Sequence, residues 1–259
     1  MSDLLDPRTL LQGYAAGIFP MADSRDAEDV FWVEPRTRAI LPIDRFILSG
    51  SLRKRIRSGR FTVTRDRAFH DVVLACAKRD ETWINPTIER ATLGLHAAGH
   101  AHSIECWRDD RLVGGLYGVR LGGAFFGESM FSREADASKV ALAWLIARLR
   151  VGGFGLLDCQ FMTDHLASLG AVTVSRDDYV GLLGVVLGTG TRGPGAGVAG
   201  AGAGAASSGP VSRVVDALGA ARRDGAEFEA LDRLLEAEGV AGASGPAGQF
   251  IAQLLGQTS

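Results

Sequence analysis

Residues 102–131 read HSIECWRDDRLVGGLYGVRLGGAFFGESMF and contain three segments with the composition of β-strands. The segments are residues 102–108, 111–120 and 123–131, and the joints Asp109-Asp110 and Gly122-Gly123 are typical of tight hairpin turns. Short joints between consecutive strands predict an antiparallel meander. The sequence therefore places an antiparallel sheet in the middle of the chain.

The segments on either side of this meander favour an α+β fold. Residues 136–151, DASKVALAWLIARLRV, have apolar side chains at helical spacing, and residues 155–161, GLLDCQF, follow as a buried strand. Because helices and strands are grouped rather than strictly alternating, the order favours α+β over a parallel α/β sheet. The other predicted elements are helices at 4–16, 68–79 and 87–98 and strands at 31–33, 39–42 and 61–64.

The composition changes sharply at residues 188–209, GTGTRGPGAGVAGAGAGAASSG. Such a run has almost no side chain able to bury apolar area, which predicts a flexible linker. Beyond it, residues 211–222 and 226–238 are predicted to form two short helices. The apolar residues Phe250, Ile251, Leu254 and Leu255 are expected to pack back on the body of the protein, because they would otherwise form an exposed patch.

Composition and charge narrow the class of protein. The chain has 259 residues, 46% of them hydrophobic, and a net charge of −2, which excludes disorder throughout and does not favour a general nucleic-acid coat. No apolar run approaches the roughly 18 residues that a membrane helix needs. The three cysteines, Cys76, Cys106 and Cys159, form no C-x-x-C pair. We therefore expect a cytoplasmic protein with reduced thiols and no membrane partner.

Polar side chains inside two apolar strands are the first candidates for chemistry. Glu128 lies in FFGESMF, and Asp158 and Gln160 lie two residues apart in LLDCQ. Burying an acid costs free energy unless the acid is paired or used. Either two carboxylates and an amide converge on one site, or the acids sit at strand ends with backbone partners.

Other kinds of site have weaker support. His96, His100 and His102 lie close together, but no nearby Cys or carboxylate completes a metal site, so no metal is expected. The chain has no G-x-S-x-G nucleophile motif, no dinucleotide fingerprint at a strand-to-helix turn and no Walker loop.

A basic cluster occupies residues 51–60, SLRKRIRSGR. Arg53, Lys54 and Arg57 fall on one helical face. The cluster is either a solvated helix face or a contact for nucleic-acid phosphates.

Several of these segments together resemble one family, the leucyl/phenylalanyl-tRNA–protein transferases of bacteria. The similar stretches are GYAAGIFPMAD (13–23), TWI (82–84), GHAHSIECWRDDRLVGGLYGV (99–119), FFGESMFSREADASKVAL (125–142), LLDCQ (156–160) and HLASLGA (165–171). The resemblance implies a small N-terminal domain, here residues 1–38, joined to a domain like that of the N-acetyltransferases, here 39–187. Residues 188–209 remain the linker, and 210–259 form a C-terminal extension.

The resemblance also implies an activity. Such an enzyme moves Leu or Phe, and also Met, from aminoacyl-tRNA to the N-terminal Arg or Lys of a protein and so marks it for degradation, without a metal or cofactor. The implied catalytic pair is Asp158, which orients, and Gln160, whose carbonyl helps to draw the proton from the amine. Glu128 is a further acidic site residue that holds either the acceptor or the donor's ribose. Arg53, Lys54 and Arg57 are expected to contact acceptor-stem phosphates.

The donor side chain needs an apolar pocket. By resemblance its lining is Leu116, Phe125, Met130, Leu142, Leu145 and Leu157. Phe125 and Met130 face opposite ways on a regular strand, so a bulge near Gly127 or a splaying of strands is expected. Trp83 and the position of Met21 belong to the adenine-binding region. Two aromatic positions of the family are here Met21 and Thr92, which predicts weaker stacking unless Phe31 or Trp32 compensates.

Two other classes of function remain open. One is a CoA-dependent N-acyltransferase of the same fold, although the segment before residue 136 lacks the glycines that let a backbone approach a pyrophosphate. The other is a non-catalytic protein that binds tRNA or peptide.

Overall fold

The sheet of the predicted meander is confirmed and extended in the computed structural model, which describes residues 5–79, 81–188, 225–242 and 244–257. Seven strands lie in the order β4-β5-β6-β7-β8-β3-β9, and every neighbouring pair is antiparallel except the parallel pair β7–β8. The strands are β3 (Thr37–Ile40), β4 (Thr62–Arg65), β5 (Ala101–Arg108), β6 (Arg111–Leu121), β7 (Ala124–Ser132), β8 (Leu156–Gln160) and β9 (Val172–Ser175). The fold is thus α+β with a mainly antiparallel sheet.

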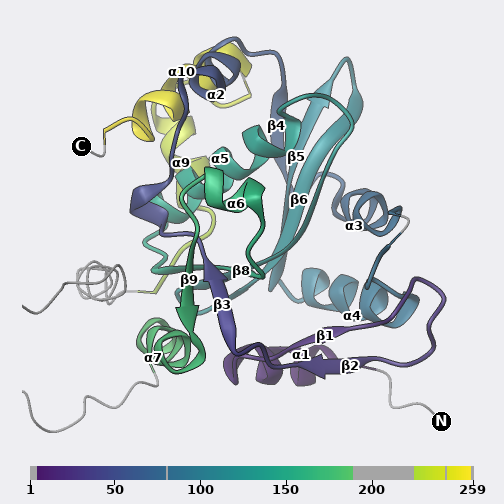
Figure 1. The fold of residues 1–259 in the computed structure, drawn as a ribbon. Coiled ribbons are helices and arrows are strands. Elements are labelled where there is room, and N and C mark those ends of the chain that lie inside the picture. The colour runs from purple at the N-terminus through teal and green to yellow at the C-terminus, as the bar shows by residue number, and fades with distance from the viewer. Residues whose placement is uncertain (1–4, 80, 189–224, 243, 258–259) are drawn as a thin grey trace, which may run out of the picture.

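Helices cover both faces of this sheet (Figure 1). One face carries α5 (Ala137–Val151), which is apolar on nearly all sides because α2 (Gly50–Arg57), the short η1 (Ile43–Arg45) and the C-terminal helices pack around it. The other face carries α1 (Pro7–Ala15), α3 (Phe69–Ala77), α4 (Pro86–Ala97) and α7 (Arg176–Leu187). The short α6 (Asp164–Ser168) follows β8.

The N-terminal region consists of α1 and a separate two-stranded sheet of β1 (Phe19–Met21) and β2 (Phe31–Val33). Asp6 caps α1 by accepting a hydrogen bond from the Arg8 backbone N–H, and Pro7 occupies the first turn, where its missing N–H costs nothing. Leu10 and Tyr14 of α1 are buried with residues of the main sheet, so this region is packed onto the larger part of the protein.

The C-terminal residues belong to the core, which confirms that the chain end packs back. In α9 (Ala230–Ala237), Leu231 and Leu235 are buried, and in α10 (Ser244–Leu254) so is Ile251, followed by Leu255. Phe228 is fully buried, stacked at 5.4 Å from the ring of Phe125 in β7. The extension therefore closes the α5 side of the core. The predicted linker beyond Gly188 and the predicted helix at 211–222 lie outside the described residues.

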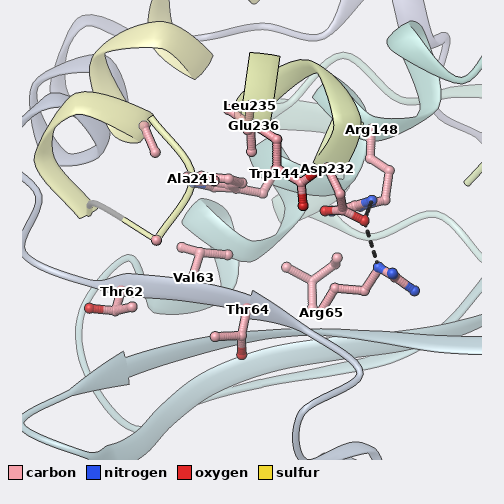
Figure 2. A pocket seen from close by; sticks show the side chains of 13 residues that line it. Thr62, Val63, Thr64, Arg65, Trp144, Arg148, Asp232, Leu235, Glu236 and Ala241 are labelled. Carbon is pink, nitrogen blue, oxygen red and sulfur yellow. Dashed lines mark hydrogen bonds and ion pairs between the residues drawn. The ribbon is translucent and has the colours of Figure 1, made fainter. Parts of the chain in front are cut away.

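Charged residues reinforce this closure around a cavity of about 380 Å³ between β4, α5 and the C-terminal helices (Figure 2). Asp232 of α9 accepts hydrogen bonds from Arg148 of α5, at 2.9 Å to Oδ2, and from Arg65 of β4, at 3.0 Å. The Arg148 guanidinium also lies over the ring of Phe228 and donates to its carbonyl oxygen. The salt bridges thus join the extension to both the sheet and its central helix.

We expect Phe228→Leu to lower the free energy of unfolding by about 1–2 kcal/mol, because the ring contacts with His102, Phe125 and Phe154 are lost while most of the volume is kept. Urea denaturation measures this change, and catalytic rate per folded molecule is expected to stay within a few-fold. Val185→Ala, at a site that is 53% exposed, is the control and should change stability by under about 0.5 kcal/mol. If the F228L protein folds but does not catalyse transfer, the C-terminal extension does more than stabilise the fold.

Among the described residues, no helix is both long enough and apolar enough to cross a membrane.

Candidate functional site

A bulge in β7 creates the site. Tyr117 of β6 pairs with Ser129, but the next residue, Gly118, pairs with Gly127, so Glu128 is an extra residue in β7. The extra residue changes the alternation, and Phe125 and Met130 therefore contact the same core cluster, as the expected bulge near Gly127 requires. A side chain at Gly118 would meet the Phe126 carbonyl oxygen at 2.3 Å, so the bulge depends on glycine there.

The neighbouring strands also separate at this point. β7 and β8 pair only from Ala124–Leu156 to Phe126–Asp158, although both strands continue. Beyond the last pair lies a pocket of about 330 Å³. The bulge and the separation of the two strands together leave space for this pocket. Continuous pairing of β7 with β8 would fill that space.

The pocket combines an apolar wall with a polar rim. Six predicted residues line it: Trp83, Leu116, Met130, Leu142, Leu145 and Leu157. Glu128 and Gln160 line it as well, so side chains from α5, β6, β7 and β8 meet here. The pocket therefore brings most of the predicted substrate residues to the two predicted polar groups.

Three of the residues predicted for catalysis or substrate binding do not line this pocket. Phe125 was predicted to line the pocket, but it is 0% exposed because its ring stacks against Phe228 in the core. Met21 of β1 packs against the other core cluster. Asp158 is 0% exposed and lies behind Gln160.

Asp158 is the centre of a buried hydrogen-bonded group. Its carboxylate accepts three bonds from Arg38: Nη2 donates to Oδ2 at 2.6 Å, and Nε donates to Oδ1 at 3.0 Å and to Oδ2 at 3.1 Å. The Tyr179 hydroxyl donates to Oδ2 at 2.8 Å, and the Gln160 backbone N–H donates to Oδ1 at 2.8 Å. Both oxygens are thus fully used by groups that hold β3, β8 and α7 together.

Arg38 is itself enclosed. Its guanidinium lies 4.5 Å from the Phe19 ring centroid and 4.7 Å from that of Tyr179, and it donates to the Gly17 carbonyl oxygen. Desolvation is the largest single influence on Arg38 and lowers its pKa, but the hydrogen bond to Asp158 and the nearby negative charges together outweigh it. The pKa of Arg38 is therefore raised, and the guanidinium stays charged. Arg38 therefore links Gly17 of the N-terminal region to Asp158 of β8.

Gln160 adopts an unusual backbone conformation. Its φ is +60°, in the left-handed region that non-glycine residues rarely occupy. Its side-chain Nε2 donates to Glu128 Oε1 at 3.0 Å. Because the amide nitrogen donates to Glu128, the amide oxygen is the side-chain atom that can accept a hydrogen bond from a ligand. Strain of this kind persists where the surrounding structure fixes it, and here Asp158 does so.

Glu128 has a strongly altered acidity. Burial raises its pKa to about 7, with the charge of Asp158 adding to the rise, while hydrogen bonds from Tyr14 and Gln160 and the charge of Arg38 oppose it. A carboxyl group with this pKa changes its charge near neutral pH. Such groups are concentrated at functional sites.

The predicted nucleic-acid residues lie elsewhere. Arg53, Lys54 and Arg57 are on α2, beside α10, and none of them lines the pocket. Thr92 is buried in α4 and offers no surface for stacking. Phe161, by contrast, lines the pocket and is 47% exposed. Among the described residues, no cluster of three His, Cys, Asp or Glu side chains is arranged to hold a metal ion.

Sequence reasoning missed three supporting residues, Arg38, Tyr14 and Tyr179. Arg38 had a usable signal, since a charge within the apolar segment TRAI needs a buried partner, just as Asp158 does. Tyr14 and Tyr179 gave no comparable signal, because a tyrosine at an apolar helical position is ordinary core.

Comparison with known proteins gives consistent matches. The family described as leucyl/phenylalanyl-tRNA protein transferase matches residues 40–184, and the N-terminal domain of the same family matches residues 3–36. A leucyl/phenylalanyl-tRNA–protein transferase of Rhizorhabdus wittichii is 61% identical over 98% of this chain and 99% of its own length. Those of Zymomonas mobilis and Cereibacter sphaeroides are each 62% identical, over 70% and 71% of this chain and 69% and 86% of their own. The chain belongs to the leucyl/phenylalanyl-tRNA–protein transferase family.

Proposed function

We propose that this enzyme transfers leucine or phenylalanine, and also methionine, from aminoacyl-tRNA to the N-terminal arginine or lysine of an acceptor protein. The observation that carries the proposal is the Gln160–Glu128 pair at the rim of an apolar pocket that opens where β7 and β8 separate. Family membership supports the class of reaction. In this view the product is marked for degradation and the enzyme works in the cytoplasm.

The donor is already an activated ester, so the protein has to supply positioning, proton handling and stabilisation of a tetrahedral intermediate. The acceptor's neutral α-amino nitrogen attacks the ester carbonyl carbon, and the C–N bond forms. The C–O bond to the ribose then breaks, the nitrogen loses one proton overall, and the ribose oxygen gains one. No oxidation or reduction takes place.

Gln160 is the residue assigned to hold the attacking amine. Its amide nitrogen is engaged by Glu128, which leaves its oxygen to accept a hydrogen bond from the amine N–H. Asp158 is a positioning residue, since it holds the Gln160 backbone N–H and does not line the pocket. The arrangement favours an amine lone pair aimed at the bound ester.

The apolar wall suits the donor side chain. Leu142, Leu145, Leu157 and Leu116 present branched aliphatic surface, and Met130 is a flexible side chain that adapts to ligands of different shape. Leucine, phenylalanine and methionine all bury apolar area there, whereas a charged side chain would lose its hydration. Trp83 and Phe161 supply the pocket's aromatic faces for the terminal adenine.

Glu128 is assigned to the acceptor. Its ionised carboxylate attracts a cationic N-terminal residue, and such a cation would in turn lower its pKa from about 7.

We predict that transfer at low acceptor concentration rises as the pH increases through about 7, because Glu128 must lose its proton to attract the acceptor. The acceptor amine adds a second rise near its own pKa of about 8. The pH profile of kcat/KM is the measurement. Glu128→Gln should remove the first rise and keep the second. A variant profile that matches the wild type would contradict this role.

The stability of the two proteins provides a second readout. The pKa of Glu128 is higher in the folded protein than in the unfolded chain. The free energy of unfolding therefore falls as the pH rises from the unfolded pKa of about 4.5 to the folded pKa of about 7. The wild type should therefore lose stability across this window relative to Glu128→Gln, by an amount on the order of 3 kcal/mol.

We propose a small N-terminal domain over residues 1–38, a catalytic domain over 39–187, a linker over 188–209 and an extension over 210–259. The first boundary falls inside β3 (Thr37–Ile40), so Thr37 and Arg38 already belong to the large sheet. The single parallel pair β7–β8, followed by separation of the two strands, supports a relation to the N-acetyltransferases. Arg53, Lys54 and Arg57 are assigned to phosphates of the acceptor stem.

The experiment is transfer of labelled leucine from leucyl-tRNA to a peptide that begins with Arg, compared with the same peptide beginning with Ala. Labelling of the Arg peptide alone supports the proposal. Equal labelling of both peptides overturns the acceptor assignment, and labelling of neither overturns the activity. Acetyl transfer from acetyl-CoA would instead support the N-acyltransferase alternative.

A further inference from the structure

A second cavity of about 520 Å³ adjoins the catalytic pocket. Its walls carry cationic side chains, whereas most of the catalytic pocket is apolar. The two cavities share Arg79, Met130 and His165 in their walls, so they are contiguous. The second cavity lies where the end of α3, the end of β7 and the beginning of α5 meet. We call it the basic groove, lined by Ala75, Lys78, Arg79, Met130, Phe131, Ser132, Arg133, Ser138 and His165.

The charge of the groove is not neutralised by the protein. None of its described wall residues is an Asp or Glu. The Arg79 guanidinium donates to the Met130 carbonyl oxygen, and Arg133 donates to the Leu112 carbonyl oxygen at 2.9 Å and lies 5.2 Å from the Phe131 ring centroid. Backbone carbonyls thus position both guanidinium groups without cancelling their charge.

Many other arginines of this chain are paired with carboxylates. Arg60 and Arg108 contact Glu134, Arg65 and Arg148 contact Asp232, and Arg38 contacts Asp158. Against this background, two carboxylate-free arginines and the exposed Lys78 in one cavity form a local site for an anion.

The first turn of α5 adds to the same field. Ser138, the second residue of this 15-residue helix, lines the groove, and the N-terminal end of a helix carries a partial positive charge. His165 Nε2 is buried and has no hydrogen-bond partner among the described groups. Burial and the nearby Lys139 lower the pKa of His165, so a neutral imidazole is available to donate or accept.

We infer that the basic groove holds the phosphodiester groups of the single-stranded 3′ end of the aminoacyl-tRNA, immediately before the terminal nucleoside in the catalytic pocket. The inference rests on the proposed function. A polyanionic strand fits the three cationic side chains Lys78, Arg79 and Arg133, whereas the cationic N-terminus of the acceptor is repelled from them. The groove therefore also separates the paths by which the two substrates reach Gln160.

The groove contacts backbone phosphates and no bases, so its effect depends on how much of the donor strand is present. Three donors distinguish this site from the α2 cluster: leucyl-adenosine, a leucylated CCA trinucleotide and full leucyl-tRNA. The first has no internucleotide phosphate, the second has the single-stranded phosphates only, and the third adds the duplex stem.

The test variant is Lys78→Gln/Arg133→Gln, and the control with equal charge loss is Arg8→Gln/Arg90→Gln, on exposed positions of α1 and α4 outside the groove. For the trinucleotide and the tRNA, the groove variant should raise KM about tenfold and lower the slope of log KM against log salt by about one to two, with kcat unchanged. Leucyl-adenosine transfer and the control variant should match the wild type.

Each outcome decides the proposal. An unchanged KM for the trinucleotide overturns the groove, even if tRNA binding weakens, because the effect then belongs to the stem. An equal loss with leucyl-adenosine also overturns it. If the double variant does not fold, Lys78→Glu at its exposed position is measured in the same way, and an unchanged KM then overturns the groove. Failure of wild-type protein to transfer from any donor instead contradicts the proposed function.

Discussion

Replacing Gln160 with glycine or with alanine is expected to lower transfer by about 10²-fold or more in both proteins, because each removes the amide that holds the attacking amine. The two variants should differ in stability. Glycine accommodates a φ of +60° without strain, so Gln160→Gly should be more stable than Gln160→Ala by about 1 kcal/mol.

Single-turnover rates and urea denaturation measure these two effects separately. The glycine variant serves as the control for folding, since it keeps the backbone geometry and loses the side chain. Turnover near that of the wild type in either variant would overturn the assignment of Gln160. A more stable alanine variant would instead contradict the strain attributed to this position.

Removal of the Asp158 carboxylate should have the largest effect on stability. Asp158→Ala leaves the charged Arg38 guanidinium buried without its partner, which costs about 3–5 kcal/mol. It also frees the Gln160 backbone N–H, so transfer in the remaining folded protein should fall by about 10²-fold. Thermal unfolding and transfer per folded molecule are the measurements.

The double variant Arg38→Met/Asp158→Leu separates the two consequences. Replacing both charges with apolar side chains of similar size should recover most of the lost stability, because no unpaired charge remains. Transfer should not recover, since the Gln160 N–H still lacks its acceptor. Recovery of transfer together with stability would mean that Asp158 serves only the fold.

The sequence predicts the local elements of this protein well, since they depend on short-range patterns. The hairpin joints at Asp109-Asp110 and Gly122-Gly123 and the apolar periodicity of 136–151 correspond to β5–β7 and α5. The acid in the apolar strand at Asp158 was also informative, because a buried carboxylate must have partners. The sequence pattern could not say which residues those partners are.

The geometry of the site was less predictable because it depends on contacts distant in sequence. Arg38 and Asp158 are 120 residues apart, so no spacing links them. Whether Phe125 faces the pocket depends on the extra residue Glu128 and on Phe228, which covers the ring from beyond the Gly/Ala-rich run. The left-handed backbone of Gln160 has no signature in its residue type.

The position of Phe228 has a consequence for biosynthesis. A ribosome that has completed residue 188 has made every strand of the sheet, yet Phe125 and the outer side of α5 still lack the segment that covers them. At roughly 5–20 residues per second, the remaining chain takes several seconds to emerge, and during that interval the nascent protein presents apolar surface to chaperones. Messages truncated before residue 225 should therefore yield aggregating or rapidly proteolysed products.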